Sequence, residues 1–294
     1  MPKTFQQRLS EAIEKKNSRV CVGLDPRYAQ LPVELRQKIE EAAGGKNALA
    51  VAESYRLFCR GVIEAVAPYA VTVKPQLAFF EAAGPAALAA LTDIIAFARS
   101  KDLLVIADAK RGDIGSTAEA YAAAYLAEDS PWRCDALTAN PYLGGDSVRP
   151  LLKTAAANGN GVYLLVRTSN PGAIDLQDVT LADETLLWQK TAGLVSDWSA
   201  EFPGAVGAVL GATYPAELVD GQAIMGDLPL LLPGYGAQGA TAADIAPALT
   251  GATVVNSSRG IIFAQPEGEE SWMDAIARAA ELMCDDLNSA PSRN

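Results

Sequence analysis

Short apolar runs recur along the chain, and each is followed by a segment compatible with a helix. We expect eight strands, at residues 19–25, 70–74, 103–110, 135–140, 161–168, 205–213, 229–234 and 252–258. The runs are continuous rather than alternating, which is typical of parallel strands buried on both faces. Eight repeats of strand and helix in a chain of 294 residues favour an α/β fold, a single-domain (β/α)8 TIM barrel. A doubly wound open sheet is the alternative.

The segments between the strands are rich in Ala, Leu and Glu. They predict helices at residues 85–100, 116–128, 147–158, 181–199 and 240–249. Pro85 suits a first helical turn, and Ser147 and Thr241 are candidate N-caps. Two connections are longer than the others, at 26–46 and 170–180, and the sequence assigns no role to the first of them.

The sequence predicts a helix at the N-terminus and a tail at the C-terminus. Phe5, Leu9 and Ile13 fall on one face of a polar, amphipathic segment, which indicates a helix rather than a signal peptide. We expect the barrel with this N-terminal helix to span residues 1–287, and residues 288–294 to form a disordered tail.

Composition narrows the possible functions. The formal charge is −11, from 24 basic and 35 acidic residues, which argues against a nucleic-acid or membrane surface. The chain has no histidine, so proton transfer falls to Lys, Asp, Glu or Tyr. Four cysteines without a CxxC pair indicate reduced thiols of a cytoplasmic protein. No apolar run approaches the ~18 residues that a membrane span needs.

Polar side chains gather where the predicted strands end. In a barrel of this kind, active sites lie at the carboxyl ends of the strands. The residues at or just past those ends are Asp25, Lys74, Asp108, Lys110, Asn140, Ser169, Gln238 and Arg259.

The segment DAKRGD at 108–113 follows the apolar run 103–107. Strand alternation puts Leu104, Ile106, Asp108 and Lys110 on one face. A carboxylate and an ammonium at the end of a buried strand are costly to desolvate unless they serve each other or a ligand. A solvated charged turn is the alternative, and it weakens because Asp25 and Lys74 also end apolar strands.

Two glycine-rich loops follow the last two strands. The segment GYGAQG at 234–239 is formally a GxGxxG motif, but it lies in the seventh unit and lacks the acidic residue expected ~20 residues later in a dinucleotide fold. With SSRG at 257–260, it is better interpreted as a phosphate site, because barrels often bind phosphate with these loops. Arg259 can then contact the anion. Two ordinary turns and a surface arginine are the alternative.

The motif DAKRGDIGSTAEAYA at 108–122 resembles the DxKxxD signature of orotidine 5′-phosphate decarboxylases. The resemblance continues in order through VGLD (22–25), VKPQ (73–76), NPYLG (140–144), RTSNPG (167–172), PGYGAQG (233–239) and SSRG (257–260). The chain length and the RTSNPG form are similar to the longer bacterial subgroup. The resemblance implies a cytoplasmic homodimer that converts orotidine 5′-phosphate to UMP in pyrimidine biosynthesis without metal or cofactor.

The resemblance also implies roles for individual residues. Lys74, Asp108, Lys110 and Asp113 would form a catalytic charge network in which Lys110 protonates the C6 carbanion. Asp113 and Thr117 would come from the partner subunit. The implied substrate contacts are Asp25 and Thr117 on the ribose, Ser169 on the pyrimidine, and Gln238, Arg259 and Gly260 on the phosphate.

Two functions other than orotidine 5′-phosphate decarboxylation are compatible with parts of the sequence. Metal-dependent sugar-phosphate decarboxylases and synthases share DxKxxD, but they carry an acidic metal ligand on the second strand, where this chain has Lys74. A non-catalytic nucleotide-binding barrel could keep the phosphate loops and lose the charges, yet all four charges are present here.

Overall fold

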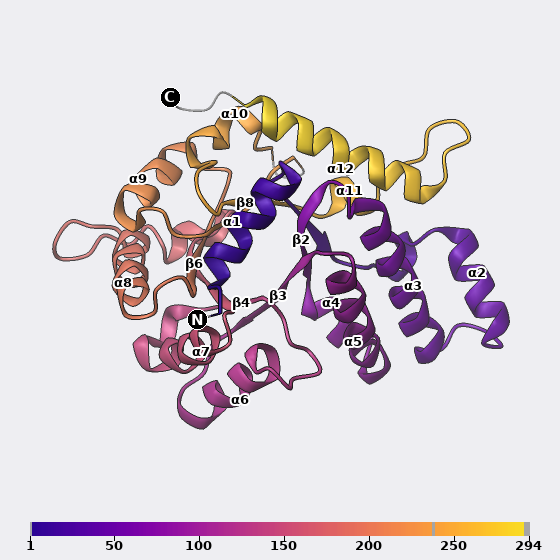
Figure 1. Ribbon diagram of the computed structural model, residues 1–294, viewed down its shortest axis with the longest axis horizontal. Coiled ribbons are helices and arrows are strands. Elements are labelled where there is room, and N and C mark those ends of the chain that lie inside the picture. Colours follow the sequence, from indigo (N-terminus) through magenta and orange to yellow (C-terminus); the bar gives the residue numbers. More distant parts are fainter. Residues whose placement is uncertain (1, 237–238, 291–294) are drawn as a thin grey trace.

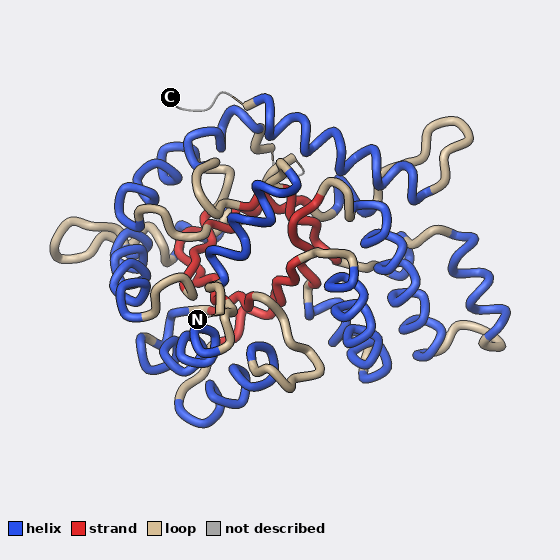
Figure 2. The backbone as a smooth tube through the Cα atoms, in the orientation of Figure 1, coloured by secondary structure: helices blue, strands red, loops and turns tan. Residues whose placement is uncertain are grey.

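The protein is described here by a computed structural model that covers residues 2–236 and 239–290. Eight parallel strands pair in chain order, and the last pairs with the first, so the sheet closes into a barrel. Figure 2 shows this ring of strands enclosed by helices. The strands are β1 (Val20–Leu24), β2 (Ala70–Pro75), β3 (Leu104–Arg111), β4 (Ala136–Ala139), β5 (Gly161–Arg167), β6 (Val206–Leu210), β7 (Leu230–Pro233) and β8 (Val254–Ser257). The predicted single-domain (β/α)8 barrel is confirmed.

Helices follow each strand and cover the outside of the barrel (Figure 1). They are α3 (Ala48–Val66), α5 (Pro85–Ser100), α6 (Gly115–Leu126), α7 (Gly145–Ala157), α8 (Leu187–Glu201), α9 (Pro215–Met225), α10 (Ala242–Ile245) and α12 (Trp272–Ser289). The additional helices are α2 (Val33–Ala42), α4 (Leu77–Ala82) and α11 (Arg259–Ile262). None of the helices in the described ranges is long and apolar enough to cross a membrane.

The helix starts confirm some of the predicted caps and correct one. Pro85 occupies the first turn of α5, and the Thr241 side chain caps α10. Ser147 is not a cap. The N-cap of α7 is Gly144, whose φ of 89° suits glycine, so the helix begins at Gly145 and the Ser147 hydroxyl donates back to the Gly144 carbonyl at 2.9 Å.

Other predicted helix bounds shift for local reasons. The helix expected from residue 181 begins at Leu187, because residues 180–186 form a turn closed by a bridge between Thr180 and Leu186. The helix expected at 240–249 divides into α10 and a 3-10 turn, Ala246–Ala248, where Pro247 cannot donate a backbone hydrogen bond. At the C-terminus, α12 continues to Ser289, so residues 288 and 289 belong to it rather than to a tail.

The long first connection, 26–46, folds onto itself at the edge of the molecule (Figure 1). It contains a 3-10 turn, Tyr28–Gln30, and α2. The Tyr28 hydroxyl donates to Glu40 at 2.5 Å, and the Lys46 ammonium lies 4.6 Å from the centre of the Tyr28 ring. These contacts account for its structure but assign it no function.

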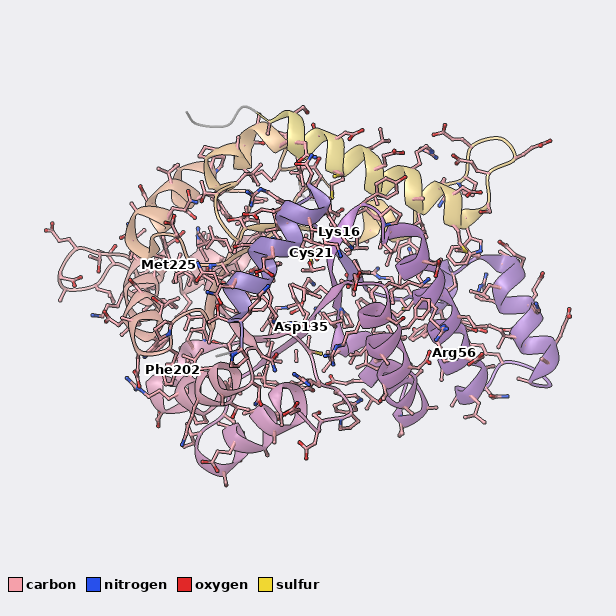
Figure 3. The ribbon with its side chains drawn as sticks, viewed as in Figure 1. Lys16, Cys21, Arg56, Asp135, Phe202 and Met225 are labelled. Atoms are coloured by element: carbon pink, nitrogen blue, oxygen red, sulfur yellow. The ribbon has the colours of Figure 1, made fainter. Side chains whose placement is uncertain are left out.

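The N-terminal helix α1 (Phe5–Lys16) closes the amino end of the barrel. Its buried residues are those expected, Phe5, Leu9 and Ile13, and they pack with barrel-interior side chains. Arg8 pairs with Asp135, labelled in Figure 3, and donates to the carbonyl of Gly159 at 2.8 Å. Because these residues precede β4 and β5, the opposite end of the barrel is left for ligands.

We expect Leu9→Ala to lower the free energy of unfolding by about 3 kcal/mol, since it leaves a cavity in a fully buried cluster. Urea unfolding followed by circular dichroism measures this change. Leu282→Ala is the matched control, because Leu282 is 59% exposed on α12 and its truncation leaves no cavity. Equal losses in the two variants would contradict a structural role for α1 as the closure of the barrel.

Candidate active site

A cavity of about 440 Å³ opens at the carboxyl ends of the strands. Its walls include Lys74 of β2, Asp108 and Lys110 of β3, and Ser169 from the loop after β5. Four residues predicted as site residues, from three parts of the chain, therefore meet at one place. This is the end of the barrel where the fold class carries its active sites.

The carboxylate of Asp108 is the centre of the site. Its Oδ2 accepts from the Lys74 ammonium at 2.7 Å and from the Gln76 amide at 2.9 Å. Its Oδ1 accepts from the Lys110 ammonium at 2.6 Å and from the Thr138 hydroxyl at 3.0 Å. Four donors on one carboxylate fix its position and hold two ammonium groups beside the cavity.

Charge decides the protonation of the two most buried groups. Burial by itself would lower the pKa of Lys74, but the charges of Asp108 and Asp25 outweigh burial and raise that pKa above its ordinary value. Burial would raise the pKa of Asp108, yet the two ammonium groups outweigh it and hold that pKa well below its ordinary value. Lys74 is therefore charged and Asp108 ionised at neutral pH.

The two lysines differ in their access to the cavity. The side chain of Lys74 is 6% exposed and that of Asp108 is 8% exposed, whereas that of Lys110 is 48% exposed. Lys110 is therefore the group in this network that a bound molecule can reach, and its contact with Asp108 restricts where its ammonium lies.

Strand alternation predicted the facing of β3 only in part. Ile106 lies in the barrel interior and Asp108 continues on that face, as expected. Lys110 does not follow by simple alternation, because its φ of 47° places it in the left-handed region and the pairing of β3 with β4 shifts between Ala107 and Arg111. A bulge, rather than a regular strand, brings Lys110 back to Asp108.

Asp25 follows β1 and lies near Lys74, whose pKa it helps to raise. Its Oδ1 is buried and accepts no hydrogen bond from any residue that the structure describes. A buried carboxylate oxygen without a donor is available to a ligand hydroxyl. Gly23 is required beside it, since a Cβ there would lie 1.9 Å from the Ser258 hydroxyl.

Asp113 and Thr117 are not part of the hydrogen-bond network around Asp108 among the described residues. The Asp113 carboxylate accepts from the next backbone N–H at 2.8 Å, and Thr117 is exposed in the first turn of α6. Among the described residues, no ion pair or hydrogen bond joins Asp113 to Lys110. The charge network inside one chain is therefore Lys74, Asp108 and Lys110.

The loops after β7 and β8 contain the predicted phosphate residues. Gly234, Gly236 and Gly239 have positive φ angles of 107°, 68° and 96°, so the turn requires glycine at these positions. Arg259 and Gly260 begin α11 and are exposed. Gln238 lies outside the described residues. The phosphate roles stay predictions.

The loop after β5 is anchored by a buried arginine that sequence reasoning missed. Arg167 is 2% exposed, pairs with Glu217 at 2.5 Å and Asp178 at 3.0 Å, and lies against the ring of Tyr214. Gln177 completes the anchor by accepting from the Thr168 backbone at 2.9 Å. These contacts fix the segment that carries Ser169 into the cavity wall.

Thr138 and Gln76 were also missed. Thr138 lies two residues before Asn140 in a short apolar strand. The alternation of side chains along that strand could have predicted that Thr138 faces the barrel interior. Gln76 lies inside the VKPQ motif, but a polar residue after a proline carries no sign of its partner. Asn140, by contrast, caps the turn Pro141–Leu143 through its side chain. No group of three or more Cys, Asp or Glu side chains in the described part of the chain could hold a metal ion.

Comparison with known proteins identifies the family of this chain. The model of the "Orotidine 5'-phosphate decarboxylase / HUMPS family" matches residues 18–272. The chain is 44% identical to the orotidine 5′-phosphate decarboxylase of Rhodopirellula baltica, over 97% of this chain and 99% of that protein. The solved OMP decarboxylase of Leishmania donovani superimposes with a TM-score of 0.76 at 31% identity, over 97% of this chain and 98% of that one. The chain belongs to the orotidine 5′-phosphate decarboxylase family.

Proposed function

We propose that this chain is a carboxy-lyase that converts orotidine 5′-phosphate to UMP in pyrimidine biosynthesis, with Lys110 as the proton donor. Membership of the family supports the overall reaction. The observation that carries the proposed chemistry is the ionised Asp108 between Lys74 and Lys110 at the cavity.

In the proposed reaction, the bond between C6 of the pyrimidine and its carboxylate breaks. Carbon dioxide leaves, and the electron pair stays on C6. The Lys110 ammonium stabilises this charge and then transfers a proton to C6, giving UMP and a neutral amine that solvent reprotonates. A cation held in advance at the reacting atom stabilises the transition state far more than one in water. The contact of the Lys110 ammonium with Asp108 at 2.6 Å holds this cation in position.

Substrate binding is assigned by the same proposal. Asp25 would accept from a ribose hydroxyl. Its buried Oδ1, which has no donor among the described residues, supports this role. Ser169 would contact the pyrimidine from the cavity wall. Gln238, Arg259 and Gly260 would hold the phosphate. The cavity volume of about 440 Å³ falls within the range of pockets for molecules of nucleotide size.

A homodimer with shared sites is the second part of the proposal. Asp113 and Thr117 would reach the partner's cavity. Three large apolar side chains of this segment and of the loop after β4 are exposed: Ile114 at 52%, Tyr142 at 72% and Leu143 at 49%. Exposed apolar side chains support an interface here when another subunit covers them.

Mixing Lys110→Ala subunits with Asp113→Ala subunits tests the shared site. Each hybrid dimer would have one intact site and one doubly mutated site. With equal amounts and random exchange, half of the dimers are hybrids, so about one quarter of wild-type activity should return. Mass spectrometry of differently tagged subunits monitors exchange. Complete exchange without recovery would mean that Asp113 serves its own chain.

The test of the function is the ultraviolet absorbance of orotidine 5′-phosphate incubated with the purified protein. We expect turnover that survives dialysis against EDTA. Turnover that EDTA abolishes and added divalent metal restores would instead favour a metal-dependent enzyme. Tight binding of UMP without any decarboxylation would identify a non-catalytic nucleotide-binding barrel.

A cytoplasmic location is also part of the proposal. All four cysteines are buried and unpaired, as suits a reducing compartment. Burial also raises the pKa of Cys21 to about 11, so this thiol stays protonated and unreactive beneath the charge network. Cell fractionation with an antibody to the native protein would test the location.

A further inference from the structure

The backbone of β3 is irregular where it carries the reactive lysine. Ala107 pairs with Leu137 and Arg111 pairs with Ala139, so four residue steps on β3 match two on β4. Within this bulge, the backbone of Lys110 has a φ of 47°, a value that residues other than glycine rarely adopt. A conformation of this kind persists only where neighbouring groups hold it.

Thr138 of β4 supplies the contacts that hold the bulge. Its Oγ1 accepts from the backbone N–H of Ala109 at 3.1 Å and from that of Lys110 at 3.0 Å. The same oxygen lies 3.0 Å from Asp108 Oδ1, to which its hydroxyl donates. The Ala107 carbonyl is more distant, at 3.5 Å.

These three contacts use the full capacity of one hydroxyl, which has one proton to donate and two lone pairs. The Thr138 residue is 1% exposed and lies in the wall of the cavity. One group therefore contacts both the backbone that carries Lys110 and the carboxylate to which the Lys110 ammonium is paired.

We propose that Thr138 is a positioning residue that places the Lys110 ammonium for proton transfer, by fixing the β3 bulge and the Asp108 carboxylate together. This inference rests on the proposed function. Without the hydroxyl, two backbone N–H groups in the bulge lose their acceptor. The left-handed conformation of the backbone at Lys110 then loses the hydrogen bonds that stabilise it. The Lys110 ammonium therefore moves away from the position that the reaction needs.

Thr138→Val tests the proposal, because valine keeps the branched shape and replaces only the hydroxyl with a methyl group. We expect kcat for orotidine 5′-phosphate to fall about 100-fold, since small displacements of a reacting group have effects of this size. The Kd for UMP, measured by calorimetry, should stay near wild type. Thr138→Ser, which keeps the hydroxyl, should restore most of kcat.

Thr253→Val is the matched control. Thr253 is also 1% exposed, but it precedes β8 at the closed end of the barrel, and its hydroxyl has no hydrogen-bond partner among the described residues. The kcat of the Thr253→Val enzyme should equal that of the wild type. A Thr138→Val enzyme as active as the wild type, assayed in parallel, would overturn the positioning role and leave the proposed function intact.

Hydrogen exchange gives a readout that needs no activity. In Thr138→Val, the peptide containing Ala109 and Lys110 should exchange about tenfold faster by mass spectrometry, because two N–H groups lose their acceptor. Thr138→Ser and Thr253→Val should exchange like wild type in that peptide. Unchanged exchange in Thr138→Val would overturn the proposal even if the wild-type protein showed no decarboxylation.

Discussion

Replacing Lys110 by alanine should lower kcat for orotidine 5′-phosphate by about 10⁴-fold or more, while the protein stays folded and still binds UMP. The side chain supplies both charge stabilisation and the proton in the proposed reaction, and each of these effects is large. Among the described residues, the Lys110 ammonium pairs with Asp108 alone, and the Lys110 side chain is half exposed, so the fold does not depend on it.

Circular dichroism and thermal unfolding check the fold of Lys110→Ala, and calorimetry with UMP checks its cavity. Lys15→Ala is the matched control, because Lys15 is 71% exposed on α1 at the closed end of the barrel. It should retain full activity. A Lys110→Ala protein that unfolds would identify the lysine as structural, and one that turns over at the wild-type rate would assign the proton to another group.

Replacing Asp108 by asparagine should both abolish turnover and destabilise the protein by about 3 kcal/mol at neutral pH. The substitution preserves the shape but leaves Lys74, whose side chain is 6% exposed, without its paired carboxylate. In the variant, burial lowers the pKa of Lys74, and the charge of Asp25 offsets this decrease only in part. Removal of one partner from a buried pair is costly because the other charge remains buried.

The pH dependence of this loss has a defined sign. The depressed pKa of Asp108 stabilises the wild type above the ordinary carboxyl value of 3.8, and this contribution disappears as the pH falls through the native value. The raised pKa of Lys74 stabilises the wild type below 10.5, and this contribution disappears as the pH rises through the native value. The difference between the two proteins should therefore be largest near neutral pH. It should shrink in strong acid, where Asp108 of the wild type is protonated, and again as the pH rises towards 10.5, where Lys74 of the variant, with its lowered pKa, loses its charge.

Urea unfolding of both proteins across this range measures the difference. Asp102→Asn is the control, since Asp102 is 78% exposed and its ion pair with Lys15 spans 3.4 Å. Such surface pairs contribute about 0.5 kcal/mol. If Asp108→Asn proved as stable as the wild type, Lys74 would have found another counterion and the proposed coupling would be wrong.

Much of the fold followed from the chain alone. The eight apolar runs correspond to β1 to β8, because strands covered on both faces must be apolar throughout. Phe5, Leu9 and Ile13 at helical spacing correctly predicted the buried face of α1. The errors lie at helix ends, such as Ser147 and Leu187, where a glycine or a tight turn decides the first residue.

The residue pattern also predicts which charges meet at the mouth of the barrel, since Lys74, Asp108 and Lys110 lie at the ends of predicted strands and parallel strands end together. The contacts that hold these charges there could be read only from the folded barrel. Gln76, just past β2, and Thr138 of β4 donate to Asp108, and a bulge rather than strand alternation returns Lys110 to the site. Strand periodicity is a local property that the chain displays. The partner of a buried polar group depends on the register between strands, which exists only once the barrel has closed.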